Sequence, residues 1–330
     1  MNRAKIAARV IAATSVLTVA VATGALVYRS VSDAQHAAAM TLPPDKPLPA
    51  PEKASLAVTR HYVGVFERGV PNTYKPVERF GHATGYRPGV VDYFSGWHDP
   101  FQARFANVAR QHGAVVLVQM LPKGYSMASI AAGRSDAYLR SYAGEVRAYG
   151  HQVILSFAPE ADGTWYPWGY GKTRARTWVA AYRHVVTVFR KAGAKNATWL
   201  WDMNIRGASK RSTGPVGDWW PGRKYVTWVG LDGYYVKPGA TFASVFGPTL
   251  RAVRRLTAKP VMIGEVGIGP VSGQVRSLPG LFAGVRRDHL LGLVYFDAGQ
   301  KGDAYHEDWR LEGHPAALRA FGRGARSLKR

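Results

Sequence analysis

Short apolar segments alternate with amphipathic helical patterns from Tyr62 to Phe321. A continuous apolar segment of about four to eight residues is typical of a strand covered on both sheet faces, whereas apolar residues at steps of three and four are typical of a helix packed on such a sheet. Strands are predicted at residues 62–66, 90–94, 114–120, 153–158, 197–202, 228–234, 261–264 and 293–296.

Three helices are predicted between these strands. Leu139, Tyr142, Val146 and Tyr149 recur at helical spacing within residues 135–150, where Ser135 is a candidate for the first cap and Gly150 for the last. A similar pattern covers residues 173–193, and a shorter one covers residues 101–113. No clear helix is predicted between residues 67 and 88, so the first unit is expected to be irregular.

The number and order of these elements predict the fold class. Eight strand–helix units in about 260 residues fit an α/β fold of the (β/α)₈ TIM-barrel type. A doubly wound open sheet is the alternative, but no Gly-rich phosphate-binding fingerprint follows an early strand. We therefore predict one barrel domain over residues 60–322, followed by a basic tail over residues 323–330.

The N-terminal segment has the pattern of an export signal. Arg3, Lys5 and Arg9 precede an uncharged run over residues 10–27, and small residues at 37–39 offer a cleavage site. Residues 1–40 are therefore predicted to be a signal peptide or a signal-anchor transmembrane segment, and residues 41–59 a Pro-rich linker. The excess of positive charge before the run places the barrel outside the cell, either membrane-anchored or secreted.

Composition excludes several kinds of chemistry. The 330 residues contain no Cys, which excludes disulfides, thiolate catalysis and Cys-based zinc sites. The ten His form no HExxH motif or spaced cluster, so neither a catalytic metal nor another cofactor is expected. Acidic residues 297, 303, 307 and 308 could hold a calcium ion, although a hydrogen-bonded loop is the preferred interpretation.

The net charge of +23 predicts attraction to anionic cell-wall or membrane surfaces. Stacking of nucleic-acid bases on the many aromatic residues is another way to use such a charge. However, the basic residues are scattered along the predicted helices and match no nucleic-acid-binding motif. A nucleic-acid partner is therefore not expected.

Two glutamates follow predicted strands closely. Glu160 follows the fourth strand and Glu265 the seventh, and catalytic groups of TIM barrels lie at the carboxyl ends of the strands. Two carboxyl groups about 5–5.5 Å apart suit double displacement at a sugar carbon. A single Glu at a strand end is also consistent with a capped or salt-bridged surface group, so the residues alone leave both interpretations open.

Aromatic residues are dense in the predicted loops. Trp rings stack on the apolar faces of sugars, but they also pack loops against a barrel rim. The aromatic residues concerned are Trp97, Trp165, Tyr166, Trp168, Tyr170, Trp201, Trp219 and Trp220.

Five motifs follow one another in the order of the predicted strands. They are PEADG at 159–163 with Trp165 and Trp168, WLWDMN at 199–204, WVGLDGY at 228–234, PVMIGEVG at 260–267, and DWR at 308–310 with PAAL at 315–318. With this set, residues 62–321 resemble glycoside hydrolase family 26, the β-mannanase-like retaining glycosidases with a TIM barrel.

The resemblance implies a role for each matching residue. Glu160 would be the general acid/base, Glu265 the nucleophile, and Tyr234 the residue that orients the nucleophile. Trp165, Trp168 and Trp201 would shape the sugar cleft, with Trp97, Asp162 and Asn204 as further substrate-binding positions. The implied activity is retaining hydrolysis of β-1,4-mannan or a related β-glucan in the endo mode, with the polysaccharide as partner.

The chain departs from the family pattern beside the acid/base. Pro159 stands where the family has His, and Asp162 stands where it has Asn. If the Asp162 carboxylate points at Glu160, it raises the pKa of that acid, whereas pairing with Lys172 or Arg174 would neutralise the effect. The departures also leave an alternative function open, a non-catalytic, wall-associated glycan-binding protein on a degenerate barrel.

Overall fold

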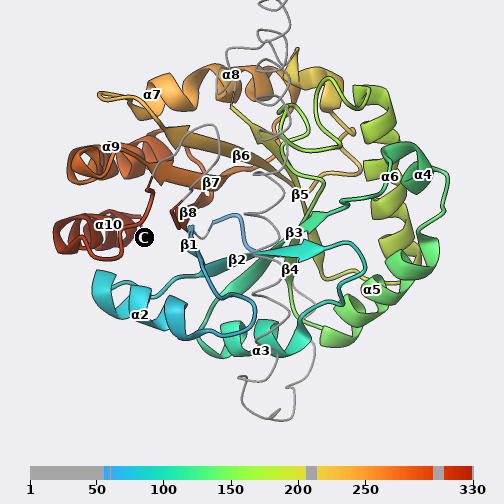
Figure 1. The fold of residues 1–330 in the computed structure, drawn as a ribbon, viewed down its shortest axis with the longest axis horizontal. Helices are drawn as coiled ribbons and strands as arrows, with labels where there is room; N and C mark the ends of the chain where they lie inside the picture. The colour runs from blue at the N-terminus through green and yellow to red at the C-terminus, as the bar shows by residue number, and fades with distance from the viewer. Residues whose placement is uncertain (1–55, 60, 206–213, 300–307, 329–330) are drawn as a thin grey trace, which may run out of the picture.

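The eight predicted strands form a closed parallel barrel in sequence order (Figure 1). A computed structural model describes residues 56–59, 61–205, 214–299 and 308–328. The strands are β1 (Tyr62–Glu67), β2 (Val90–Gly96), β3 (Val115–Leu121), β4 (Val153–Phe157), β5 (Ala197–Asn204), β6 (Trp228–Tyr235), β7 (Val261–Ile268) and β8 (Gly292–Asp297). Strand β8 pairs with β1, which closes the barrel and excludes the open doubly wound sheet.

Helices surround the barrel on its outside (Figure 1). They are α2 (Lys75–Thr84), α3 (Ala103–Gln111), α4 (Met127–Ala131), α5 (Asp136–Tyr149), α6 (Ala175–Lys191), α7 (Phe242–Val245), α8 (Gly247–Leu256), α9 (Gln274–Arg287) and α10 (Pro315–Ser327), with short 3₁₀ turns η1 (Val216–Trp219) and η2 (Val271–Gly273). The predicted helices at 101–113, 135–150 and 173–193 correspond to α3, α5 and α6.

The first unit is more regular than the sequence predicted. Helix α2 lies in the segment where no helix was expected, with Pro76 in its first turn and Val77 and Phe80 buried against the barrel. Gly85 ends the helix in the left-handed region at φ 62°. The prediction was wrong because two apolar side chains suffice to hold a short helix once a covered sheet lies beneath it.

The ends of two other helices refine the sequence predictions. Gly150 ends α5 at φ 76°, as predicted, but the Ser135 side chain makes no capping hydrogen bond. Helix α10 continues to Ser327, five residues past the predicted boundary of the barrel domain. Its continuation buries Ala325, which explains why the helix does not end where the basic residues begin.

The barrel interior changes from apolar to polar along the strands. One layer of buried side chains at the beginning of the strands includes Val90, Leu117, Ile154 and Leu200. Because side chains alternate between faces, the residue two positions further along each strand also points inward. Those residues are Asp92, Gln119, Ser156 and Asp202, all buried. The polar layer therefore lies nearer the carboxyl ends of the strands.

The predicted signal or anchor segment, 1–40, and residues 41–55 of the predicted linker lie outside the described residues. Within the part of the chain that the structure describes, no helix is both long enough and apolar enough to cross a membrane.

Candidate active site

Glu160 and Glu265 lie at the carboxyl end of the barrel. Glu265 is within β7, and Glu160 follows the end of β4 by three residues. Both are largely buried, with 8% and 6% of their surfaces exposed. The charge of Glu265 is a cause of the raised pKa of Glu160, which places the two carboxyl groups within electrostatic reach of each other.

The backbone that carries Glu160 adopts an uncommon conformation. Ala158 and Glu160 lie in the left-handed region, with φ of 47° and 52°, which non-glycine residues adopt at a cost. The Glu160 N–H donates to the Asp202 carbonyl at 2.9 Å, and the Trp178 indole donates to the Ala158 carbonyl at 3.1 Å. The Trp168 indole donates to the intervening carbonyl of Pro159 at 2.8 Å. These bonds hold the backbone of Glu160 in this conformation.

The Glu160 carboxyl group accepts one hydrogen bond on each oxygen. The Asn204 side-chain amide donates to Oε1 at 2.5 Å, and the Trp165 indole donates to Oε2 at 2.9 Å. Burial, followed by the charge of Glu265, raises the pKa of Glu160 well above its usual range, and the two hydrogen bonds oppose this shift. Glu160 is therefore suited to carry a proton at neutral pH.

Glu265 also accepts a hydrogen bond on each oxygen. The Tyr234 hydroxyl donates to Oε2 at 2.5 Å, and the Gln119 amide donates to Oε1 at 2.6 Å. The same amide nitrogen of Gln119 donates to Asp92 at 2.8 Å. Burial raises the pKa of Glu265, whereas the bonds from Tyr234 and Gln119 lower it. Both oxygens of this carboxylate are thus fixed by donors that favour its charged form.

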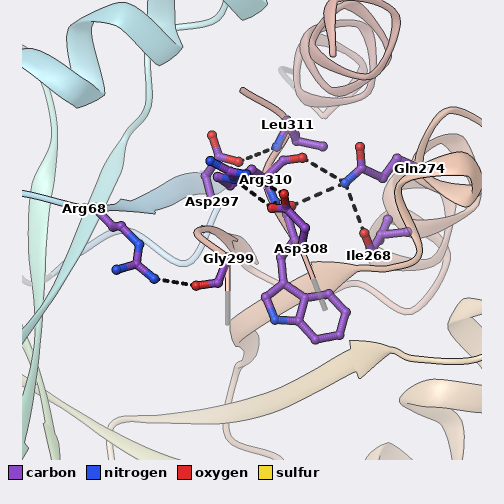
Figure 2. A network of polar contacts seen from close by, with 9 residues as sticks. Arg68, Ile268, Gln274, Asp297, Gly299, Asp308, Arg310 and Leu311 are labelled. Atoms are coloured by element: carbon purple, nitrogen blue, oxygen red, sulfur yellow. Dashed lines mark hydrogen bonds and ion pairs between the residues drawn. The ribbon is translucent and has the colours of Figure 1, made fainter. Parts of the chain in front are cut away.

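Tyr234 is held from behind by the segment that follows β8. Its ring packs on Trp309 with ring centres 4.9 Å apart. The Trp309 carbonyl accepts from the Tyr295 hydroxyl at 2.8 Å and from the Gln274 amide at 3.4 Å. Figure 2 shows Gln274 reaching this segment, where it also donates to Arg310 and Ile268. The hydroxyl that orients Glu265 therefore sits on a fixed support.

A layer of buried acids lies beneath the two glutamates. Asp92, Asp202 and Asp232 are almost fully buried. Burial raises the pKa of Asp202 to about 7, and it raises the pKa of Asp92 and Asp232 well above their usual range. A side chain at Gly264 would place its Cβ 2.5 Å from Asp202 and 2.6 Å from Asp232, so this layer requires glycine on β7. These acids are suited to hold protons near neutral pH.

The side chain of Asp162 contacts the backbone of the strand that carries Asn204. Its Oδ1 accepts the backbone N–H of Asn204 at 2.8 Å, and its charge is a cause of the raised pKa of Asp202. The charges that raise the pKa of Glu160 are those of Glu265 and Asp202. Asp162 instead fixes the backbone of the residue that donates to Glu160.

The tryptophans expected in the cleft lie in different environments. Trp165 is 41% exposed beside Glu160, and Trp97 is half-buried against Phe157. Trp168 and Trp201 are 1% and 0% exposed, so they do not face solvent. Trp168 stacks on Tyr166 and Trp201 packs edge-on against Trp220. These two residues support the loops rather than line an open surface.

The sequence missed the residues beneath and beside the glutamates. Gln119, Asp92, Asp202 and Asp232 were not predicted as site residues, although each is a polar residue inside an apolar strand. That combination is the feature that could have identified them, because a polar side chain in a doubly covered strand has to point into the barrel interior.

The acidic segment after β8 is held by hydrogen bonds where it is described. Asp297 accepts the N–H of Leu311, and Asp308 pairs with Arg310 at 2.5 Å, as Figure 2 shows. Residues 303 and 307, the other two calcium candidates, lie outside the described residues. In the described part of the chain, no group of three or more His, Asp or Glu has the geometry of a metal site.

Two characterised proteins are similar in sequence. No protein-family model matches the chain. It is 26% identical over 269 residues to endoglucanase H of Acetivibrio thermocellus, covering 77% of this chain and 29% of that protein. It is 27% identical over 125 residues to a β-1,3-xylanase of a Vibrio species, covering 38% of this chain and 26% of that protein. The chain thus spans less than a third of either relative.

Solved structures share the fold. The catalytic domain of a family 26 endo-β-1,4-mannanase from a Bacillus species superposes with a TM-score of 0.63 at 14% identity, covering 87% of this chain and 95% of that one. A modular family 26 endo-β-1,4-mannanase from Cellulomonas fimi has a TM-score of 0.62 at 16% identity, covering 81% and 71%. The resemblance to glycoside hydrolase family 26 is confirmed at the level of the fold.

Proposed function

We propose that this chain is a retaining glycoside hydrolase in which Glu160 is the general acid/base and Glu265 the nucleophile. The observation that carries the proposal is the unequal treatment of the two carboxyl groups. Burial raises the pKa of both groups and each accepts two hydrogen bonds that oppose the shift, but the pKa of Glu160 is raised further because the charge of Glu265 adds to the effect of burial. A double displacement needs one carboxylate and one carboxylic acid in the same site.

The reaction proceeds in two displacements. A Glu265 oxygen attacks the anomeric carbon while the glycosidic C–O bond breaks, and the leaving oxygen takes the proton of Glu160. Water then loses a proton to Glu160 and attacks the same carbon, which releases the sugar and restores the Glu265 carboxylate. The product keeps the configuration of the substrate.

The electrostatic link between the glutamates supports the change of role of Glu160. While Glu265 is charged, it raises the pKa of Glu160 and keeps it protonated. In the covalent intermediate that charge is absent, so the pKa of Glu160 falls and the group can accept a proton from water. The same residue can therefore serve as acid in the first step and as base in the second.

The substrate we propose is a β-1,4-mannan or a related β-glucan, cleaved within the chain. This rests on the names of the similar proteins, an endoglucanase and two endo-β-1,4-mannanases. The exposed ring of Trp165, which donates to Glu160, offers a stacking surface for a sugar beside the acid. Since one similar protein is a β-1,3-xylanase, β-1,3-xylan should be tested as a substrate beside β-1,4-mannan and β-glucan.

The test is release of reducing sugar from these polysaccharides by wild type, Glu160→Gln and Glu265→Gln. Both substitutions keep the size of the side chain, and we expect each to lower kcat by at least about a thousandfold. Glu78→Gln on the outer helix α2 is the matched control and should keep the wild-type rate. Wild-type rates in both site variants would exclude the mechanism.

The same screen separates the proposal from the glycan-binding alternative. A protein that binds insoluble polysaccharide without releasing reducing sugar would support the alternative. The described site favours hydrolysis, because both carboxyl groups and their donors are present despite Pro159 and Asp162. Pro159 contributes its carbonyl to the bond with Trp168, and Asp162 positions the backbone of Asn204.

We also propose that the barrel is exported and lies outside the cell, either anchored by residues 10–27 or secreted. The support is the pattern of charged and apolar residues at the N-terminus. Protease added to intact cells should digest the barrel. A barrel shielded from protease until the cells are broken would contradict this orientation.

A further inference from the structure

The end of the barrel opposite the glutamates is defined by the last turns of the outer helices. Each long helix returns the chain from the carboxyl end of one parallel strand to the beginning of the next, so its last turn lies away from the site. Hydrogen bonds between neighbouring helix ends agree with this. Arg326 at the end of α10 donates to the Gly85 carbonyl that ends α2, and Arg147 at the end of α5 donates to the Ala192 carbonyl that ends α6. We call this end the basal face.

The basal face carries charge of almost one sign. It consists of the last turns of α2, α3, α5, α6, α8, α9 and α10 and the connections that follow them. The exposed cations in these segments are Arg87, Arg147, Arg190, Lys191, Lys195, Arg254, Arg255, Arg286, Arg287 and Arg326. In these described segments the one carboxylate is Asp288, which already pairs with Arg287 at 2.8 Å.

In its described segments, the opposite end of the barrel carries charges of both signs. There, acidic and basic residues are mixed, as in the pairs Asp136 with Arg140 and Asp308 with Arg310. The net positive charge of the chain alone therefore does not explain why the basal face carries so few carboxylates. At the other end of the barrel, cations stand beside carboxylates.

Helix stability explains only part of this arrangement. Cations in a last turn interact favourably with the helix dipole, which accounts for residues such as Arg254 and Arg286. Arg87 and Lys195 follow the ends of their helices, in the connections to the next strand, where the dipole gives no such preference. It also gives no reason for Asp288 to be the one carboxylate in the described connections. A partner that is itself anionic explains all of these observations.

We propose that the basal face docks on the surface of an anionic lipid bilayer, with the Glu160–Glu265 site facing away from it. The cations are distributed around the barrel axis on several helices, which suits a broad, flat partner rather than a small ligand (Figure 1). Most of them are arginines, whose planar guanidinium group binds phosphate with two parallel hydrogen bonds. This proposal is independent of the catalytic activity.

The path of the chain favours a bilayer over a soluble polyanion. Strand β1 begins at Tyr62 on the basal face, so the sequence that precedes the barrel joins the domain on this side. That sequence includes the uncharged run over residues 10–27. An apolar segment that precedes a domain along the chain and a polybasic surface where the chain enters that domain are two signals for membrane association that reinforce each other.

The experiment measures sedimentation of the full chain with vesicles of phosphatidylcholine, with and without phosphatidylglycerol. The basal variant is Arg254→Gln/Arg255→Gln/Arg286→Gln. A cation near an anionic surface strengthens binding about fivefold, so we expect the basal variant to bind phosphatidylglycerol vesicles about a hundredfold more weakly than wild type. High salt should weaken wild-type binding in the same direction.

The matched control removes the same charge from the other end of the barrel. Arg134→Gln/Arg174→Gln/Arg176→Gln neutralises three exposed arginines near the beginnings of α5 and α6 and should bind within about twofold of wild type. Binding to vesicles of phosphatidylcholine alone, which includes any contribution of residues 10–27, should be equal for all three proteins.

Two results would overturn the proposal. If the basal and control variants lose affinity equally, net charge rather than the basal face decides binding. If soluble poly(glycerol phosphate) displaces the wild-type protein from vesicles at equal phosphate concentration, the face recognises a polymer and the assignment to a bilayer fails.

Discussion

Replacing Tyr234 by Phe removes one donor from the proposed nucleophile and leaves its surroundings in place. The Tyr234 hydroxyl donates to Glu265 Oε2 at 2.5 Å, while the ring packs on Trp309 and Phe296. Phe keeps these ring contacts, so no cavity forms. The substitution therefore tests the hydrogen bond and not the packing.

The expected magnitude follows from the kind of bond that is lost. A hydrogen bond to a charged group contributes about 1.5–3 kcal/mol, which corresponds to about one to two pKa units. The bond from Tyr234 is the largest of the effects that lower the pKa of Glu265. Without it the pKa of Glu265 rises, and the nucleophile becomes protonated at a higher pH.

The assay is the pH profile of kcat/KM on whichever β-glycan the screen identifies. The acidic limb, where Glu265 gains a proton, should move upward by about one to two units in Tyr234→Phe. Tyr235→Phe is the matched control on the same strand, because the buried Tyr235 hydroxyl has no hydrogen-bond partner among the residues that the structure describes. An acidic limb that stays at the wild-type position, or that moves equally in the control, would refute this account of the site.

Three further substitutions test other parts of the structure. Gly163→Ala places a Cβ 2.4 Å from the Trp165 ring, so the indole should leave Glu160 and kcat should fall about tenfold while the fold is kept. Asn204→Leu removes a bond that lowers the pKa of Glu160, so the alkaline limb of kcat/KM should move upward by about one unit. Burial and a neighbouring carboxylate raise the pKa of Glu67 to about 10, so the stability it contributes is complete in acid and lost as pH rises towards 10. As pH rises from about 5 to about 10, the free energy of unfolding measured with urea should therefore fall less steeply in Glu67→Gln than in wild type.

Each of these predictions has a clear contrary result. Gly144→Ala in α5, where a Cβ would meet no atom within 4 Å, is the control for Gly163→Ala, and equal kcat in the two variants would contradict the displacement of Trp165. A downward shift of the alkaline limb in Asn204→Leu would mean that its amide does not stabilise the charged form of Glu160. An unchanged pH dependence in Glu67→Gln would mean that Glu67 is already ionised in the folded protein at neutral pH.

The strands and the two glutamates could be predicted from the sequence because they depend on local patterns. A strand covered on both faces has to be apolar, so segments such as residues 115–121 and 153–157 are identifiable without knowledge of their neighbours. Once eight such strands are expected to form a barrel, the residues at their ends are known to share one rim. Glu160 and Glu265 are therefore candidates before any contact is known.

The partners of these glutamates depended on the tertiary structure. Gln119 donates to Glu265 across 146 positions of sequence, and Asn204 donates to Glu160 across 44. Such pairs are decided by the register of neighbouring strands and by the closure of the barrel, which no local pattern contains. For the same reason, the sequence left open whether the Asp162 carboxylate points at Glu160 or pairs with a nearby cation. The left-handed backbone at Glu160 turns this segment, and Asp162 meets the backbone of Asn204 instead.

For the charged residues, too, the sequence shows their number and the fold decides their location. The excess of cations is evident from composition, but their side of the molecule is not. Arg87, Arg147 and Arg254 are far apart in sequence and look scattered along it. They share one face because every outer helix runs back against its strand, which brings the ends of all the helices to the same end of the barrel. The sequence determined which residues are charged or buried, and the closure of the barrel decided which of them act together.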